Sequence, residues 1–147
     1  MAETEPQIAA ARRMFAAIPQ VAALGIVIDE MAPGKARMTM PYDARLVGDP
    51  VTGAIHGGAV STLLDTCSGA AVACHPQAAG PTATIDLRIN YIRPADPGQA
   101  ITARAECYHV TRSFAFIRAT AHDDDTSLPV AEAVGTFTFE AGPRVAT

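Results

Sequence analysis

The tripeptide His56-Gly57-Gly58 stands directly before an apolar, alanine-rich run that contains one carboxylate, Asp65. A helix begins with unpaired backbone N–H groups and a partial positive charge, and glycines let a bulky carbonyl approach them. The start of such a helix can stabilise an oxyanion. Asp65 is the only charged side chain between His56 and His75, so it is a candidate general base or nucleophile.

Gly57 and Asp65 are too far apart along one helix to act on the same carbonyl group. Their separation of eight residues, at a rise of about 1.5 Å per residue, amounts to roughly 12 Å. A base and an oxyanion donor must both lie within about 3 Å of the reacting atoms. If both residues act, the sequence predicts a two-fold homodimer in which each site combines Gly57 of one copy with Asp65 of the other.

The elements that position these residues can be read from the hydrophobic pattern. A run that is apolar over most of its surface predicts a buried helix, and a sheet must then cover most of its sides. We therefore expect an α+β fold with an antiparallel sheet wrapped around one long central helix. The expected elements are a helix over 7–18 ended by Pro19, a hairpin over 24–40, a loop over 42–55, the long helix over 57–73 ending near His75-Pro76, and strands over 84–91, 99–110, 113–122 and 128–140, the last three forming a meander.

The strand over 84–91 has the clearest alternation in the chain. Its apolar residues are Ile85, Leu87, Ile89 and Tyr91, and its polar residues are Thr84, Asp86, Arg88 and Asn90. Because side chains alternate between the two faces of a strand, the polar residues are expected in one row. That row is either a solvent face or a contact between dimers.

Length and composition limit the remaining possibilities. A chain of 147 residues with 49% hydrophobic residues fits one domain over 1–147, with a helical region over 1–20, a core over 20–140 and a tail over 141–147. The net charge of -4 and the scattered Lys and Arg residues argue against a nucleic-acid partner. Neither a secretory signal nor a run of about 18 apolar residues is present, so we expect a cytoplasmic protein without a membrane partner.

Metal binding is not expected either. The three cysteines are an odd number, and Cys67, Cys74 and His75 lack further ligands at close spacing. The acidic run over 123–125 lacks the glycine and distal glutamate of a calcium loop and stands where a hairpin needs turn residues. No metal or redox cofactor is expected.

Several motifs together resemble those of the hotdog-fold acyl-CoA thioesterases, specifically the phenylacetate-degradation (PaaI) type of the 4-hydroxybenzoyl-CoA thioesterase superfamily. The resemblance covers roughly residues 20 to 140. It rests on His56-Gly57-Gly58 followed by Leu64-Asp65, on Thr84-Ile85-Asp86 through Tyr91-Ile92-Arg93-Pro94-Ala95, and on the turn Thr111-Arg112-Ser113.

The resemblance implies roles for individual residues. Asp65 would be the base or nucleophile, the Gly57 N–H would polarise the thioester carbonyl, His56 would support that geometry, and Thr84 would help to position water. Coenzyme A, as part of the substrate, would be held by a second group of residues: Gly58, Tyr91, Arg93, Pro94, Arg112 and Ser113, with the two arginines as phosphate partners. Relatives often have Asn shortly before the glycine pair, whereas this chain has Asp49, which is either its replacement or a plain loop residue.

The resemblance implies hydrolysis of an acyl-CoA to the free acid and coenzyme A. Asp65 would either deprotonate a water molecule or attack the thioester to form a mixed anhydride. The acyl group stays open between aryl and medium aliphatic chains, the carrier between coenzyme A and acyl-carrier protein, and the assembly between a homodimer and the expected dimer of dimers. The alternative functions are a hydratase or dehydratase that acts on acyl-thioesters, with His56 as its proton carrier, and a non-catalytic acyl-CoA binding module.

Overall fold

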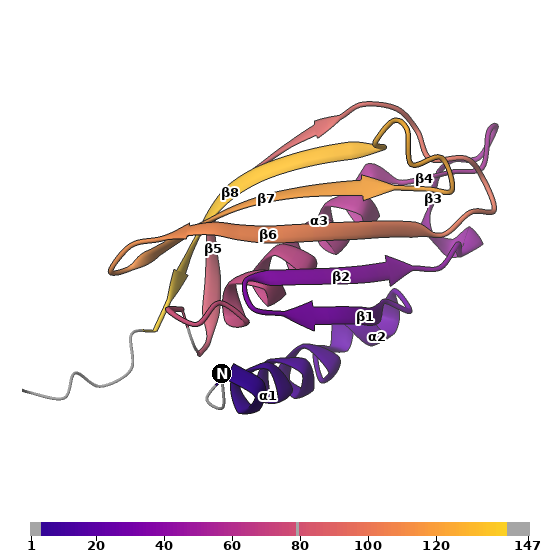
Figure 1. The fold of residues 1–147 in the computed structure, drawn as a ribbon. Helices are drawn as coiled ribbons and strands as arrows, with labels where there is room; N and C mark the ends of the chain where they lie inside the picture. The colour runs from indigo at the N-terminus through magenta and orange to yellow at the C-terminus, as the bar shows by residue number, and fades with distance from the viewer. Residues whose placement is uncertain (1–3, 79, 141–147) are drawn as a thin grey trace, which may run out of the picture.

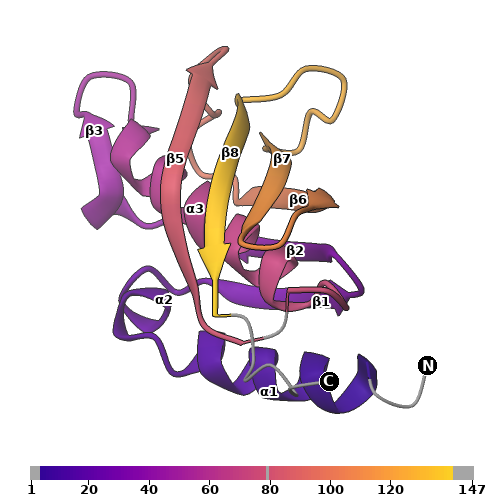
Figure 2. The ribbon, with the colours of Figure 1, turned by 90° about the vertical axis from the view of Figure 1, so that its left-hand side faces the viewer.

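A six-stranded antiparallel sheet with one long helix against its inner face forms the centre of the protein, as the computed structural model shows (Figures 1 and 2). The structure describes residues 4–78 and 80–140, so the expected tail over 141–147 lies outside the described residues. The elements are α1 (Thr4–Ala16), α2 (Pro19–Ala23), β1 (Val27–Ala32), β2 (Lys35–Met40), η1 (Ala44–Leu46), β3 (Val47–Asp49), β4 (Ala54–Ile55), α3 (Gly57–Ala73), β5 (Thr82–Tyr91), β6 (Ile101–Val110), β7 (Phe114–His122) and β8 (Ala131–Phe139).

The strand order in the sheet is β1-β2-β6-β7-β8-β5. The predicted hairpin over 24–40 is confirmed as β1 and β2, whose turn contains Gly34 with a positive φ of 68°. The predicted meander is confirmed as β6, β7 and β8. Strand β5, which follows α3 in the chain, pairs with β8 and forms one edge of the sheet.

Small side chains on the inner face of the sheet let α3 approach it closely. The buried residues of β6, β7 and β8 include Ala103, Ala119 and Ala133. The helix presents Leu64 and Cys67, both fully buried, together with a series of alanines. A sheet lined with alanine leaves room for a buried helix, which is why the alanine-rich run over 59–73 becomes the centre of the fold.

Helix α1 packs along α3 from the end that lies far from His56. Helix α2 lies nearer the start of α3, where its residue Gln20 lines a depression together with His56. Gln7 on α1 donates to the carbonyl oxygens of Ala73 and His75, both at 2.9 Å, and so satisfies carbonyl groups at the end of α3. Pro19 does more than end α1, because it is the first residue of α2. Proline suits this position since the first helical N–H has no helical acceptor.

The segment over 42–55, expected to be a loop, contains the short helix η1 and the small hairpin of β3 and β4. This hairpin lies beside the start of α3. Gly48 allows the close approach, because a Cβ at this position would lie 2.7 Å from the His56 Cα. The segment therefore packs beside the glycine pair as regular secondary structure.

The C-terminal half of β5 follows the predicted alternation. Leu87 and Ile89 pack against the core beneath the sheet. Arg88 and Asn90 are exposed on the opposite face. This half of the strand therefore separates apolar and polar side chains as the sequence indicates.

A β-bulge reverses the alternation near the start of β5. The register with β8 shifts between Thr84 and Asp86, so Ile85 is an extra residue. Thr84 pairs with Phe137, whose side chain is buried beneath the sheet, and therefore faces α3. The expectation that Thr84 and Asp86 share one polar row is wrong, because the extra residue moves Thr84 to the other face.

Candidate active site

One backbone N–H group at the start of α3 has no acceptor among the described residues. His56 is the N-cap, and its Nδ1 accepts a hydrogen bond of 2.8 Å from the Gly58 N–H. The next two N–H groups, of Ala59 and Val60, donate to the His56 carbonyl oxygen at 3.0 and 3.4 Å. Within residues 4–78 and 80–140 the Gly57 N–H has no acceptor. The group expected to bind an oxyanion is thus available for a ligand.

His56 is held in one tautomer by these contacts. Because Nδ1 accepts from Gly58, a neutral imidazole must have its proton on Nε2. The backbone N–H of His56 donates to the Leu46 carbonyl oxygen at 2.8 Å, which fixes the residue to the segment before β3. The exposed His56 ring can therefore offer Nε2–H as a donor at the mouth of the site.

Tyr91, at the end of β5, covers one side of the glycine pair. Its hydroxyl donates to the Gly57 carbonyl oxygen at 3.2 Å. A Cβ on Gly57 would lie 3.2 Å from the Tyr91 ring, so a glycine here leaves room for the aromatic ring. The structure therefore brings Tyr91 to the predicted oxyanion donor, where its side chain is 55% exposed.

Asp65 lies two turns further along α3 and is half-buried. The hydroxyl of Thr84 donates to its Oδ1 at 2.7 Å. Among the described residues, Oδ2 has no hydrogen-bond donor. One oxygen of Asp65 is thus oriented by β5, and the other is free to accept a proton or to attack a carbonyl carbon.

Gly57 and Asp65 belong to one uninterrupted helix of 17 residues. The helical spacing on which the separation of roughly 12 Å depends is therefore present. Strand β5 touches both residues, with Tyr91 at Gly57 and Thr84 at Asp65.

Asp49 forms a turn beside the site. Its carboxylate accepts hydrogen bonds of 2.9 Å from the Val51 N–H and from the Thr52 hydroxyl. The hydrogen bond from the Val51 backbone N–H, followed by the hydrogen bond from the Thr52 hydroxyl, lowers the pKa of Asp49. As a carboxylate already occupied by two donors of its own loop, Asp49 has the contacts of a turn residue.

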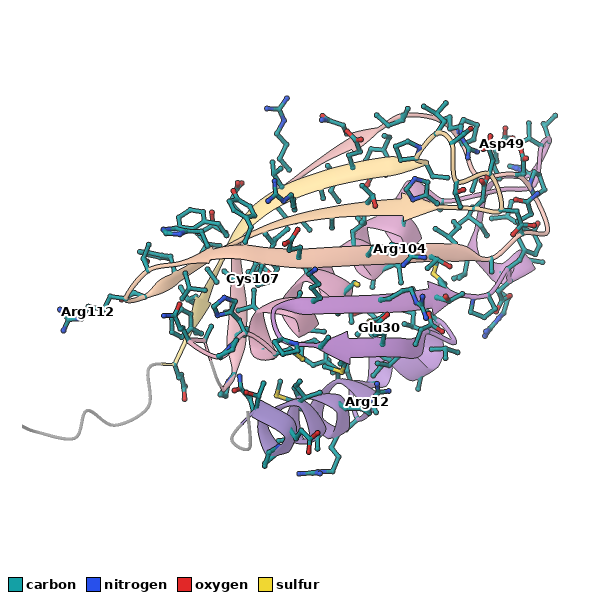
Figure 3. All side chains as sticks on the ribbon, in the orientation of Figure 1. Arg12, Glu30, Asp49, Arg104, Cys107 and Arg112 are labelled. Atoms are coloured by element: carbon teal, nitrogen blue, oxygen red, sulfur yellow. The ribbon has the colours of Figure 1, made fainter. Side chains whose placement is uncertain are left out.

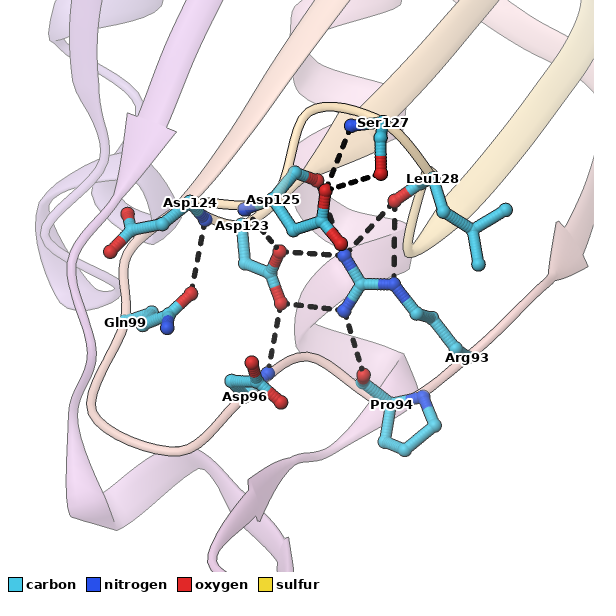
Figure 4. Close-up of polar contacts among 9 residues, drawn as sticks. All are labelled: Arg93, Pro94, Asp96, Gln99, Asp123, Asp124, Asp125, Ser127 and Leu128. Atoms are coloured by element: carbon cyan, nitrogen blue, oxygen red, sulfur yellow. Dashed lines mark hydrogen bonds and ion pairs between the residues drawn. The ribbon is translucent and has the colours of Figure 1, made fainter.

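Arg93 is enclosed by protein acceptors (Figure 4). Its guanidinium forms a two-pronged ion pair with Asp123, at 2.7 and 2.6 Å, and also donates to carbonyl oxygens that include those of Pro94 and Leu128. The Asp123 side chain is fully buried, and these hydrogen bonds from Arg93 strongly lower its pKa. The N–H groups of Arg93 that were expected to contact phosphate are therefore already occupied by protein acceptors. Arg93 instead joins the β5–β6 connection to the β7–β8 connection.

Arg112 and Ser113 lie at the opposite end of the sheet from the glycine pair. Figure 3 shows Arg112 extending from the β6–β7 turn at one end of the molecule and Asp49 at the other. Within one chain, the structure does not bring this turn to Gly57. If Arg112 or Ser113 contacts the substrate held at Gly57, they must come from another copy of the chain.

Two of the depressions on the surface of the described residues bear on the site. One, of about 390 Å³, lies beside the predicted site and is lined by residues that include His56, Gly58, Ala59 and Thr62. The other is a groove of about 610 Å³ over the charged outer face of the sheet, and it touches none of the predicted site residues. The smaller depression is the one that the predicted chemistry can use.

The cysteines have the surroundings of core residues. All three are buried and free, and burial raises the pKa of Cys67 to about 12 and of Cys74 and Cys107 to about 11. Within the described ranges, no group of three or more His, Cys, Asp or Glu side chains is placed to hold a metal ion. No helix in the same ranges is long and apolar enough to cross a membrane.

Two residues with structural roles were not singled out individually from the sequence. Gly135 on β8 faces the bulge of β5, where a Cβ would lie 2.5 Å from the Asp86 carbonyl oxygen. Asp123 is the partner of Arg93, although it stands in a run of three acids that reads as a turn. A glycine inside a strand pattern is the one signal that could have indicated the bulge.

Comparison with known proteins gives a consistent picture. The family model described as the thioesterase superfamily matches residues 52–130. A candidate esterase of Halobacterium salinarum is 40% identical over 75 residues, which cover 49% of this chain and 50% of that protein. Human acyl-coenzyme A thioesterase 13 is 31% identical over 91 residues, which cover 62% of this chain and 63% of that protein. The matches thus span about half to two thirds of these two relatives.

Solved structures extend the similarity to nearly the whole chain. A Pseudomonas aeruginosa protein is 35% identical and has a TM-score of 0.80, and its alignment covers 92% of this chain and 100% of that chain. The PaaI protein of the Escherichia coli phenylacetic acid degradation operon is 25% identical and has a TM-score of 0.79. Its alignment covers 90% of this chain and 91% of that chain. The predicted sheet wrapped around a central helix, the hotdog fold, is confirmed.

Proposed function

Because this chain belongs to the thioesterase superfamily, we propose that it is an acyl-CoA thioesterase that uses Asp65 and the Gly57 N–H in a site shared by two copies. The observation that supports this most directly is the unpaired Gly57 N–H at the start of α3, combined with the Asp65 carboxylate that Thr84 orients. These are an oxyanion donor and a base, the two groups that acyl transfer to water requires.

The reaction converts an acyl-CoA and water into a carboxylic acid and coenzyme A. Water adds to the thioester carbon while one of its protons passes to Oδ2 of Asp65. The carbonyl oxygen becomes an oxyanion that accepts a hydrogen bond from the Gly57 N–H. When the C–S bond breaks, the sulfur leaves as a thiolate and takes up the proton from Asp65.

A second route starts from the same geometry. Oδ2 of Asp65 attacks the thioester carbon, coenzyme A leaves as the thiolate, and water then hydrolyses the mixed anhydride. A single turnover in water enriched in oxygen-18 detects the anhydride route when that water attacks the Asp65 carbonyl carbon of the anhydride. Label incorporated into the Asp65 carboxylate marks the anhydride route, because in the general-base route that carboxylate exchanges only protons.

The shared site is supported by the helical separation of Gly57 and Asp65 and by the exposed edge of the sheet. Strand β5 has ten residues, and on its free edge Ile85 is 59% exposed. A long edge strand with unpaired backbone N–H and C=O groups is suited to pairing with another chain. Pairing of β5 with its copy around a two-fold axis would place two copies of α3 side by side, giving two sites per dimer.

Coenzyme A is proposed to lie across the dimer. Gly58 and Tyr91 lie at the start of α3 in one copy, and Pro94 follows the end of β5. The turn that contains Arg112 and Ser113 would come from another copy. The sequence similarity to a human acyl-coenzyme A thioesterase supports an acyl-CoA substrate. The structural similarity to PaaI, from a phenylacetic acid degradation operon, supports an aryl acyl group, and a medium-chain acyl group is the other proposal.

The decisive experiment measures free thiol released from phenylacetyl-, benzoyl- and aliphatic acyl-CoAs. Asp65→Asn should lower kcat by about a hundredfold or more, because the amide cannot accept the proton. Asp86→Asn is the matched control, since it makes the same chemical change on the exposed face of β5. Equal activity of wild type and Asp65→Asn, or no turnover of any acyl-CoA by the wild type, would refute the proposed function.

A further inference from the structure

The position of Thr84 depends on the bulge in β5. From Leu87 onward the strand alternates regularly, and continued alternation toward its start would place Thr84 on the outer face. Because Ile85 is an extra residue, Thr84 is turned toward α3 and its hydroxyl reaches Asp65 at 2.7 Å. The contact therefore exists because of one inserted residue in the strand.

The bulge in turn depends on Gly135 in the neighbouring strand. Gly135 pairs with Leu87, immediately after the bulge. A Cβ at position 135 would lie 2.5 Å from the Asp86 carbonyl oxygen and 3.0 Å from Leu87 Cδ1. The first of these atoms belongs to the backbone of the bulge and cannot rotate away as a side chain can. Any larger residue at 135 must displace this part of β5.

We propose that Gly135 is a positioning residue for the active-site carboxylate. It makes room for the bulge, the bulge turns Thr84 inward, and the Thr84 hydroxyl holds Oδ1 of Asp65 so that Oδ2 faces the reacting atoms. Gly135 touches neither substrate nor Asp65 and acts through the shape of β5. This inference rests on the proposed function of Asp65, but the link between Gly135 and the bulge does not.

The first test is a double-mutant cycle on kcat. Thr84→Val should lower kcat about tenfold in the wild-type background, the size expected for one hydrogen bond to a charged group, and leave KM within about twofold. Gly135→Ala should lower kcat by a similar factor. In the Gly135→Ala background, Thr84→Val should have less than about a twofold effect, because the hydroxyl has already left Asp65.

The matched control is Ala133→Gly, a change on the same strand that loses a packed methyl group without entering the bulge. It should destabilise the fold while kcat stays near the wild-type value, and Thr84→Val should keep its full effect in this background. A Gly135→Ala protein that folds and retains wild-type kcat, or in which Thr84→Val keeps its tenfold effect, overturns the proposal.

The second test needs no substrate and covers the case in which Gly135→Ala alone fails to fold. Deleting Ile85 should remove the bulge, so that the Asp86 carbonyl no longer points at residue 135. Thermal unfolding is then measured for the wild type, Gly135→Ala, the Ile85 deletion and the combined variant. Gly135→Ala should lower Tm much less in the deletion background than in the full chain. An equal loss of Tm in both backgrounds overturns the role of Gly135. Intact Tm coupling without any thioesterase activity would instead refute the proposed function alone.

Discussion

The Gly57 N–H can be removed without removing any other hydrogen bond. Gly57 is the first residue of α3, a position that tolerates proline, and His56 already has the extended backbone, with ψ of 135°, that a residue before proline prefers. We predict that Gly57→Pro lowers kcat by about a hundredfold, the cost of losing one oxyanion donor, in thiol-release assays.

Gly57→Ala is the matched control for this substitution. It adds a Cβ at the same place, 3.2 Å from the Tyr91 ring, but keeps the N–H. If crowding of Tyr91 were the whole effect, alanine and proline would lower kcat equally. A larger loss with proline than with alanine assigns the difference to the N–H group.

At the scale of elements, the Arg93–Asp123 pair joins two connections at one end of the sheet. We predict that Arg93→Gln lowers the free energy of unfolding by about 3 kcal/mol, because it leaves the buried Asp123 carboxylate without its partner. Chemical denaturation measures this change. The KM for acyl-CoA should stay within about twofold in the folded enzyme, whereas a phosphate contact would raise KM without loss of stability.

The same ion pair predicts a pH dependence of stability. Arg93 holds the pKa of Asp123 far below its usual range in the folded protein, and the unfolded chain has the ordinary value of about 3.9. The pair therefore contributes its full stability above about pH 4 and loses it as the pH falls further. Denaturation from pH 7 to pH 2 should show this loss in wild type, and an Asp123→Asn protein should start less stable and lose less.

At the scale of the whole molecule, the shared site can be tested by mixing subunits. A heterodimer of one Asp65→Asn chain and one Gly57→Pro chain keeps one wild-type pair of Gly57 and Asp65, if each site takes these residues from different chains. We predict about half of the wild-type activity per purified heterodimer. Both homodimers should be nearly inactive, and an inactive heterodimer would show that the two residues act within one chain.

Some features follow from the sequence alone because they depend on local pattern. The apolar run after the glycine pair predicts α3, the alternation over 84–91 predicts β5, and turn residues predict the meander. The candidate groups Gly57 and Asp65 are recognised from their residue types. Their separation follows from the rise per residue of one continuous helix. These inferences need only periodicity and helical rise.

Other features are decided only by the tertiary structure, because they depend on residues distant in sequence. Thr84 reaches Asp65 because Gly135, in another strand, has no side chain to exclude the bulge. Arg93 forms an ion pair with Asp123, 30 residues away, although the neighbouring residues in the sequence suggest a surface cation. Alternation and residue type do not predict these two contacts. The contacts depend on the register between strands and on the space that a neighbouring strand leaves open.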